Sequence, residues 1–282
     1  MKRPKRILLT LEALDMSGVS FSAQNLVAGL NRHGSQIMVL ARDGHEREAG
    51  FREAGAQVLF SRYFGLPLLG HPALAAVRAF RPEIAHAQSV AVLGRSHRLA
   101  QGLGVPLVVT ANRLDDAETV DLASVPDAGL VAVSDAIQER LINRGGVARD
   151  RIRIIPNGLD LTHFPAPDLD AEHKTGHVPV VGAYGTLAAH KGQRVFLQAA
   201  ARVLERKTDA EFLIMGHGPD KPNLRRLAEE LGITSRVTFS PSTSTDILSL
   251  GSLDLFVEPT FQEGFGLSVL QAMAAGVPVV AS

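Results

Sequence analysis

The chain has 282 residues, of which 45% are hydrophobic and 21% charged, and this length and composition suggest two globular domains. Lys plus Arg and Asp plus Glu each number 29, so no net charge would attract nucleic acid. Cysteine is absent, which excludes disulfides, thiolate metal sites and cysteine nucleophiles. The start lacks a signal peptide, and no apolar run approaches the ~20 residues of a membrane-spanning helix. We therefore expect a cytoplasmic protein, with peripheral association at the inner face of the membrane as an alternative.

The first half of the chain alternates short β-rich apolar runs with helical patterns, which is typical of βαβ units around a parallel sheet. Strands are predicted at 7–11, 37–40, 57–60, 84–87, 107–110, 130–133 and 152–155. One helical face after the first strand is apolar, at Ala23, Leu26, Val27 and Leu30. Ser134 or Asp135 is expected to cap the helix that follows the sixth strand. The pattern predicts one complete α/β domain.

The second half repeats this alternation after a stretch, 161–177, that contains Pro165 and Pro167 and little apolar periodicity. Strands are predicted at 178–183, 212–215, 237–239, 253–257 and 277–281, with helices near 193–205, 223–231 and 266–275. The chain ends directly after a predicted strand, so we expect the second domain to be incomplete. The predicted division is 1–160 for the first domain, 161–177 for a linker and 178–282 for the second domain.

Two glycine-containing turns follow predicted strands and precede predicted helices. Gly18 lies between the first strand and helix, where backbone amides can approach a phosphate. A tight turn without a ligand explains it equally well, and the spacing does not match the dinucleotide fingerprint G-x-G-x-x-G. In the second half, Gly185 and Thr186 precede Lys191, which can reach a diphosphate as a point charge. The alternative is a solvated lysine at a helix end.

Two further segments extend this pattern in the second half. Gly216 and Gly218 follow the next strand, where glycine permits a close backbone approach or merely a turn. The sharpest signal is Glu263, which stands before a helix whose first amides would point at an anion. The residues that supply this helix start are Gly264, Phe265, Gly266 and Leu267. Gln271 lies about two turns beyond Glu263. A sugar, a diphosphate and a ribose would fit along such an edge.

Together these segments resemble the retaining glycosyltransferases of family 4, of the GT-B type, from the first strand to the last residue. The family's pattern of Glu, seven residues and Glu begins at Glu263 and reaches Gln271, so its second position departs. The family's Gly-Arg-Leu with a following Lys-Gly is matched at Gly185, Thr186, Leu187, Lys191 and Gly192, with threonine for arginine. Its serine-led helix and Pro-Asn-Gly-x-Asp segment are matched at Ser134, Pro156, Asn157, Gly158 and Asp160. In the first half, the family's histidines become His86, Gln88 and Asn112.

The resemblance implies a GT-B fold, with two Rossmann-like doubly wound domains facing across a cleft, the second one incomplete. It implies transfer of a sugar from a nucleoside diphosphate sugar to a hydroxyl acceptor with retention and no required cofactor or metal. The acceptor would be a sugar, a lipid-linked sugar or a small molecule, in the synthesis of a glycan, glycolipid or cell-envelope polysaccharide.

The resemblance also assigns roles to individual residues. Lys191 would neutralise the phosphates and Glu263 would orient the sugar hydroxyls, while Gln271 would meet the ribose. The diphosphate would be held by backbone amides at Gly18, Gly264, Phe265, Gly266 and Leu267, with Gly185, Thr186, Gly216 and Gly218 beside the donor. His86 would contact the acceptor or the sugar, and Asn112 would lie on the acceptor side.

Other interpretations remain open on the residues alone. The departures at Thr186, Gln271 and Asn112 are compatible with a non-catalytic nucleotide-sugar binder, and another GT-B enzyme such as an epimerase is a further alternative. Asp168 and Asp170 have the spacing of a metal-binding pair but lie in the predicted linker. Asp115 and Asp116 are interpreted as a solvated turn or a helix cap, and the scattered histidines do not suggest a zinc site.

Overall fold

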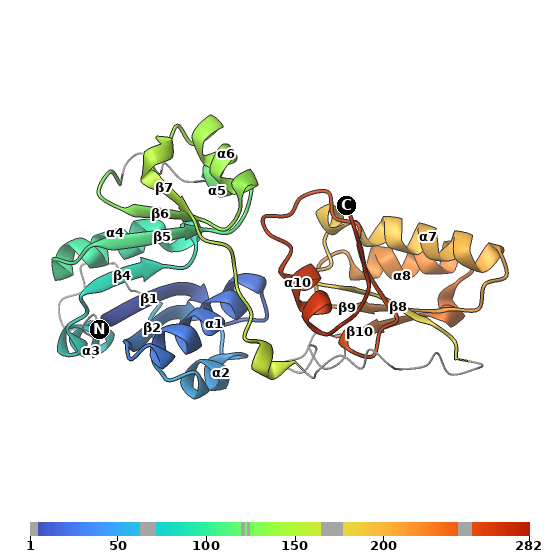
Figure 1. Cartoon of the computed structure of the whole chain (residues 1–282), viewed down its shortest axis with the longest axis horizontal. Helices are drawn as coiled ribbons and strands as arrows, with labels where there is room; N and C mark the ends of the chain where they lie inside the picture. Colours follow the sequence, from blue (N-terminus) through green and yellow to red (C-terminus); the bar gives the residue numbers. More distant parts are fainter. Residues whose placement is uncertain (1–4, 63–71, 120–121, 123–124, 165–176, 242–249) are drawn as a thin grey trace. The chain divides into compact units, whose positions relative to one another are not determined.

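The computed structural model divides the chain into two compact units, Met1–Gly158 and Leu159–Ser282 (Figure 1). It describes residues 5–62, 72–119, 122, 125–164, 177–241 and 250–282. Asp168 and Asp170, together with most of the predicted linker, lie outside the described residues. None of the helices within these described ranges is both long and apolar enough to cross a membrane.

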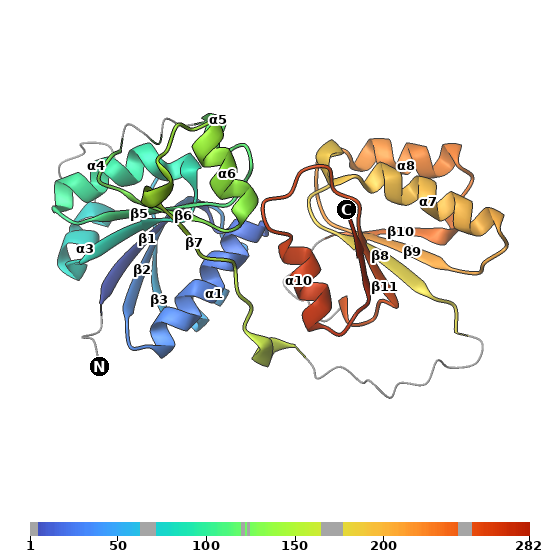
Figure 2. The same ribbon diagram turned by 45° about the horizontal axis from the view of Figure 1, so that its top comes forward.

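The first unit contains a parallel sheet of seven strands in the order β3-β2-β1-β4-β5-β6-β7 (Figures 1 and 2). The strands are β1 (Arg6–Ala13), β2 (Gln36–Asp43), β3 (Ala56–Phe60), β4 (Ile84–Ala87), β5 (Leu107–Ala111), β6 (Gly129–Ala132) and β7 (Ile152–Ile154). The strand order changes direction at β1, which pairs with β2 on one side and with β4 on the other. Loops that follow the strands on either side of such a point are where open α/β sheets bind ligands.

Helices cover both faces of this sheet (Figures 1 and 2). They are α1 (Gly18–Arg32), α2 (Glu48–Glu53), α3 (Pro72–Phe80), α4 (Leu93–Leu103), α5 (Asp116–Thr119) and α6 (Asp135–Asn143). On one face, Leu9 of β1 belongs to a core cluster with Val27 of α1 and Phe51 of α2. On the opposite face, the hydroxyl of Thr10 is 2.7 Å from that of Ser96 in α4. Successive residues of β1 therefore face opposite sides of the sheet and pack against different helices, as the two-residue period of a strand requires.

The second unit contains a parallel sheet of five strands in the order β10-β9-β8-β11-β12. The strands are β8 (Val180–Tyr184), β9 (Glu211–Met215), β10 (Val237–Ser240), β11 (Leu255–Glu258) and β12 (Val279–Ala281). Helices α7 (Gln193–Glu205) and α8 (Lys221–Glu230) cover one face, and α10 (Leu267–Ala274) covers the other (Figures 1 and 2). The buried apolar residues accordingly form two clusters, one around Phe196 and Ile214 and one around Phe256 and Ala272.

The predicted α/β class and all twelve predicted strands are found, although several strand ends differ by up to three residues. Strands β8 and β12 begin directly after Pro179 and Pro278, whereas the predicted strands include these prolines. Proline has no backbone N–H and cannot donate a ladder hydrogen bond. It can still accept one, and the Pro278 carbonyl accepts a hydrogen bond from the Phe256 amide at 2.9 Å.

Candidate functional site

The loops that follow β8, β9 and β11 meet at the carboxyl-terminal edge of the second sheet. The Leu187 amide donates to the His217 carbonyl at 2.8 Å, which joins the loops after β8 and β9. The Phe261 amide donates to the His190 carbonyl at 2.8 Å, which joins the loops after β8 and β11. The strands are parallel, so all three loops leave the same edge. This edge therefore gathers the candidate site residues of the second half of the chain.

Three glycines allow the backbones of these loops to touch. A Cβ on Gly192 would lie 1.7 Å from the Pro259 carbonyl oxygen, and one on Gly216 would lie 1.9 Å from the Gly185 carbonyl oxygen. A Cβ on Gly218 would lie 2.2 Å from the Leu187 carbonyl oxygen. No side chain fits at these distances. The close approach predicted at Gly216 and Gly218 is thus an approach to the chain's own backbone, whereas no described residue crowds the Cβ position of Gly185.

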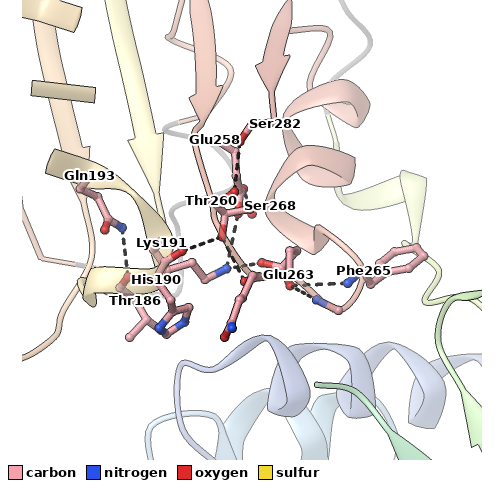
Figure 3. A network of polar contacts seen from close by, with 12 residues as sticks. Thr186, His190, Lys191, Gln193, Glu258, Thr260, Glu263, Phe265, Ser268 and Ser282 are labelled. Carbon is pink, nitrogen blue, oxygen red and sulfur yellow. Dashed lines mark hydrogen bonds and ion pairs between the residues drawn. The ribbon is translucent and has the colours of Figure 1, made fainter. Parts of the chain in front are cut away.

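Lys191 lies at the centre of a polar network on this edge (Figure 3). It ends the 3-10 helix η5 (Ala189–Lys191), and its ammonium donates to Oε2 of Glu263 and lies 3.4 Å from Oε1 of Glu258. Oε2 of Glu258 accepts a hydrogen bond from the Ser268 hydroxyl in the first turn of α10. One ammonium is therefore shared by two carboxylates, and one of them is tied to the start of α10.

The electrostatic environment differs for each member of the network. Burial raises the pKa of Glu258, and the Lys191 charge and the Ser268 hydroxyl oppose this only in part. Burial would lower the pKa of Lys191, but the charges of Glu258 and Glu263 outweigh it and raise that pKa. Burial also opposes ionisation of Glu263, yet Lys191 and the two backbone amides of Gly264 and Phe265 together lower its pKa.

The segment before α10 folds back onto Glu263. The amides of Gly264 and Phe265 donate to Oε1 of Glu263 at 2.9 and 3.5 Å. Two of the amides that are predicted to hold an anionic ligand thus donate to this carboxylate, and their contact with a diphosphate stays a prediction. Gly266 is the N-cap residue of α10 with φ of 81°, and Leu267 is the first residue of the helix. The helix start thus lies beside Glu263, as the sequence predicts.

Thr186 and Gln271 occupy the two donor-site positions where the sequence departs from the family pattern. Thr186 is exposed, and its carbonyl accepts a hydrogen bond from Nε2 of Gln193 at 3.0 Å. This bond fixes the loop after β8 against the first residue of α7. Gln271 lies on α10 and is only 4% exposed. Its predicted contact with a ribose therefore depends on the few accessible atoms of a buried side chain, and it stays a prediction.

Glu258 and Ser268 belong to this network, although neither is a candidate on sequence grounds. Glu258 ends a strand whose preceding residues are apolar, and it is only 4% exposed. An acidic residue at the end of a buried strand indicates that a positively charged or hydrogen-bonding partner lies nearby, because an ionised carboxylate is costly to bury without a partner. The sequence contains no corresponding signal for Ser268.

The first unit contains the remaining predicted site residues. Gly18 is the exposed first residue of α1, and the helix is capped by Ser17, whose hydroxyl accepts from the Ser20 amide at 3.4 Å. The predicted turn between strand and helix is confirmed. Ser134 caps α6 in the same way by accepting from the Ile137 amide at 3.3 Å. Binding of a ligand by Gly18 stays a prediction.

His86 and Asn112 bind neighbouring residues at the carboxyl-terminal edge of the first sheet. Nε2 of His86 lies 2.8 Å from the Thr110 hydroxyl, and burial lowers the pKa of His86 to about 4. The imidazole is therefore neutral at pH 7. Nδ2 of Asn112 donates to the Gln88 carbonyl at 2.7 Å and so joins the loops after β4 and β5. Both side chains therefore connect β4 and β5, or the loops after them, and their predicted contacts with a ligand stay predictions.

The Asp115 and Asp116 pair is only partly a solvated turn. Asp115 pairs with Arg113 near the surface, as expected. Asp116 is buried, and its Oδ2 accepts from the amides of Asn112 and Arg113 at 2.8 and 3.0 Å. The interpretation as a solvated residue is wrong for Asp116, because its carboxylate replaces water as the acceptor for two turn amides. Across the described residues, no group of three or more His, Asp or Glu side chains could hold a metal ion.

Comparison with known families identifies both halves of the chain. Residues 16–163 match the family model described as glycosyltransferase family 4, and residues 178–282 match the one described as glycosyl transferases group 1. The D-inositol 3-phosphate glycosyltransferase of Rhodococcus opacus is 29% identical over an alignment of 316 positions, gaps included, which covers 95% of this chain and 71% of that protein. The 2-deoxystreptamine glucosyltransferase of Streptomyces kanamyceticus is 28% identical over 163 residues, or 55% of this chain and 42% of that protein.

Solved structures resemble the fold of the whole chain. The crystal structure of Anabaena HepE in complex with UDP and glucose has a TM-score of 0.80 and 19% sequence identity, and the match covers 98% of this chain and 80% of that one. A complex of the same protein with UDP-glucose matches equally well, with a TM-score of 0.80. At this level of identity the likeness concerns the fold.

Proposed function

The chain belongs to glycosyltransferase family 4, and on this premise we propose that it transfers a sugar from a nucleoside diphosphate sugar to a hydroxyl group with retention of configuration. The observation that carries the proposal is the position of Lys191, whose ammonium lies beside Glu263 near the start of α10. A lysine and a helix amino terminus both favour a phosphate group. The second unit would thus bind the donor and the first unit the acceptor.

The proposed reaction breaks the bond between the anomeric carbon and the diphosphate oxygen and forms one to the acceptor oxygen. The acceptor proton passes to an oxygen of the departing diphosphate. Charge develops on the diphosphate and the sugar in the transition state, so groups aimed at these atoms contribute most to the rate. Lys191 would stabilise the leaving diphosphate, and the Glu263 carboxylate would orient the sugar hydroxyls and stabilise the positively charged sugar.

The comparisons suggest which ligands to test first. HepE was crystallised with UDP-glucose, and two relatives are named for inositol 3-phosphate and 2-deoxystreptamine. Both acceptors are hydroxylated six-membered carbocycles. We therefore propose a screen of UDP-glucose, GDP-mannose and ADP-glucose against these two acceptors. Formation of a glycoside supports the proposal, and NMR of the product reports whether the anomeric configuration of the donor is retained.

A Glu263→Gln variant tests the proposed chemistry separately from binding. Loss of one electrostatic contact to a transition state lowers turnover by about a hundredfold to a thousandfold. We expect such a loss in turnover with little change in donor affinity, because the amide still accepts a hydrogen bond. Binding of a nucleotide sugar without transfer to any acceptor by the unaltered protein would instead support a non-catalytic binder. Unchanged transfer by the variant would remove Glu263 from the site.

A further inference from the structure

Glu258 differs from the other acidic group of the network in what stabilises its charge. It is 4% exposed, and its contacts are the Lys191 ammonium at 3.4 Å and the Ser268 hydroxyl. Glu263 also contacts Lys191, but its carboxylate accepts two backbone amide hydrogen bonds in addition. A backbone amide that belongs to the same loop remains in place when Lys191 moves. Glu258 therefore depends on Lys191 more than Glu263 does.

A diphosphate that binds Lys191 changes the surroundings of Glu258 in two ways. The Lys191 ammonium moves toward the phosphate and donates hydrogen bonds to it, which weakens the attraction between the ammonium and the buried Glu258 carboxylate. The phosphate also brings further negative charge close to that carboxylate. Both changes disfavour the ionised form of a carboxyl group. Protonation of Glu258 removes the repulsion and leaves Lys191 with a neutral neighbour.

We propose that Glu258 is a positioning residue of the donor site that takes up a proton when the diphosphate of the donor binds Lys191. The inference rests on the proposed function, because it assumes a diphosphate at this position. Three elements act on the Glu258 carboxyl group: η5 through the Lys191 ammonium, α10 through the Ser268 hydroxyl, and the loop before α10 through the repelling charge of Glu263. A protonated Glu258 is itself a donor, so the Ser268 hydroxyl can become the acceptor and the link to α10 persists.

The proposal fixes the sign of the pH dependence. The carboxyl group has a higher pKa in the donor complex than in the free protein, so binding takes up protons between the two pKa values. Donor affinity is therefore highest at low pH and falls as pH rises through this interval, by at most about tenfold per pH unit. Burial already raises the pKa of Glu258 in the free protein, which brings the interval closer to neutral pH.

Titration calorimetry with UDP-glucose, GDP-mannose and ADP-glucose, repeated from mildly acidic to mildly alkaline pH, tests the proposal. A diphosphate esterified at both ends has no proton of its own to exchange in this range. Repeating each titration in buffers of different ionisation enthalpy gives the number of protons taken up. We expect uptake of up to one proton by the unaltered protein, and none by Glu258→Gln. The affinity of Glu258→Gln should be independent of pH and match that of the unaltered protein at low pH.

Two further variants control the experiment. Glu211→Gln removes a partly exposed carboxylate that pairs with Arg236, and it should leave proton uptake unchanged. Ser268→Ala removes the hydroxyl that stabilises ionised Glu258, so the fall in donor affinity should move to higher pH. This variant also tests proton uptake by Glu258 if Glu258→Gln does not fold. Donor binding without proton uptake, or unchanged uptake by Glu258→Gln, overturns this inference alone. Failure of the unaltered protein to bind any of the three donors overturns the proposed function as well.

Discussion

Gly192 and Pro259 touch through their backbones, and this contact places Lys191 beside Glu258. A Cβ on Gly192 would lie 1.7 Å from the Pro259 carbonyl oxygen, and Gly192 itself has φ of 70°. Lys191 and Glu258 are the residues immediately before these two. The approach of the two loops thus determines the 3.4 Å separation between the Lys191 ammonium and the Glu258 carboxylate.

We expect Gly192→Ala to destabilise the protein by about 3 kcal/mol or more. The added methyl group must displace a backbone carbonyl, and the alanine must also adopt a left-handed backbone conformation. Gly232→Ala is a matched control. Gly232 has φ of 68°, but apart from its chain neighbours no atom of the described residues lies within 4 Å of where its Cβ would stand, so that variant should lose only about 1 kcal/mol. Denaturant unfolding measures both values. Equal losses would show that the contact with Pro259 contributes nothing.

We expect Lys191→Ala to weaken binding of UDP by about tenfold to a hundredfold, because a hydrogen bond to a charged group is lost. Uridine has no phosphate, so its affinity should not change. Lys207→Ala removes an exposed lysine beyond the opposite end of α7 and serves as the control. Calorimetry with both ligands and both variants measures the difference. An equal loss for UDP and uridine would contradict a phosphate contact.

Gln271→Glu tests the predicted contact with the ribose. A negatively charged carboxylate can accept hydrogen bonds from both ribose hydroxyls. We therefore expect about tenfold tighter binding of UDP and a greater preference for UDP over 2′-deoxy-UDP. Because residue 271 is only 4% exposed, the new charge should also lower the melting temperature of the ligand-free protein. A lower melting temperature with unchanged affinity and ribose preference would make Gln271 a packing residue only.

We expect the protein to lose stability in acid because His86 has a lowered pKa in the folded state. Its pKa is about 4 in the folded protein against an ordinary value of 6.5, so the unfolded chain binds more protons between these two pH values. Stability is therefore fully present above about pH 6.5 and falls as pH decreases toward 4, by about 3 kcal/mol from this group alone. His86→Gln should lose part of the pH dependence of unfolding, whereas His33→Gln, at an exposed position, should retain it. Identical pH profiles for His86→Gln and the unaltered protein would contradict this assignment.

The fold could be predicted from the sequence because its signals are local. Each buried parallel strand is a short apolar run, and each covering helix shows an apolar face such as that of Ala23 and Val27, which are both fully buried. The predicted strand starts at Val178 and Val277 are wrong because apolar composition continues through the prolines that follow them, whereas the hydrogen-bond ladder begins only after these prolines.

The amino-acid sequence by itself thus determined the α/β class, the twelve strands found among the described residues, the family, and the grouping of Lys191 with Glu263 in one candidate site. Only the tertiary structure decided which side chains meet in hydrogen bonds and ion pairs. Glu258 is 67 residues from Lys191 along the chain and 10 residues from Ser268, and no local periodicity relates the three. They meet because parallel strands bring the loops after β8 and β11 to one edge, and because Gly192 lets those loops touch.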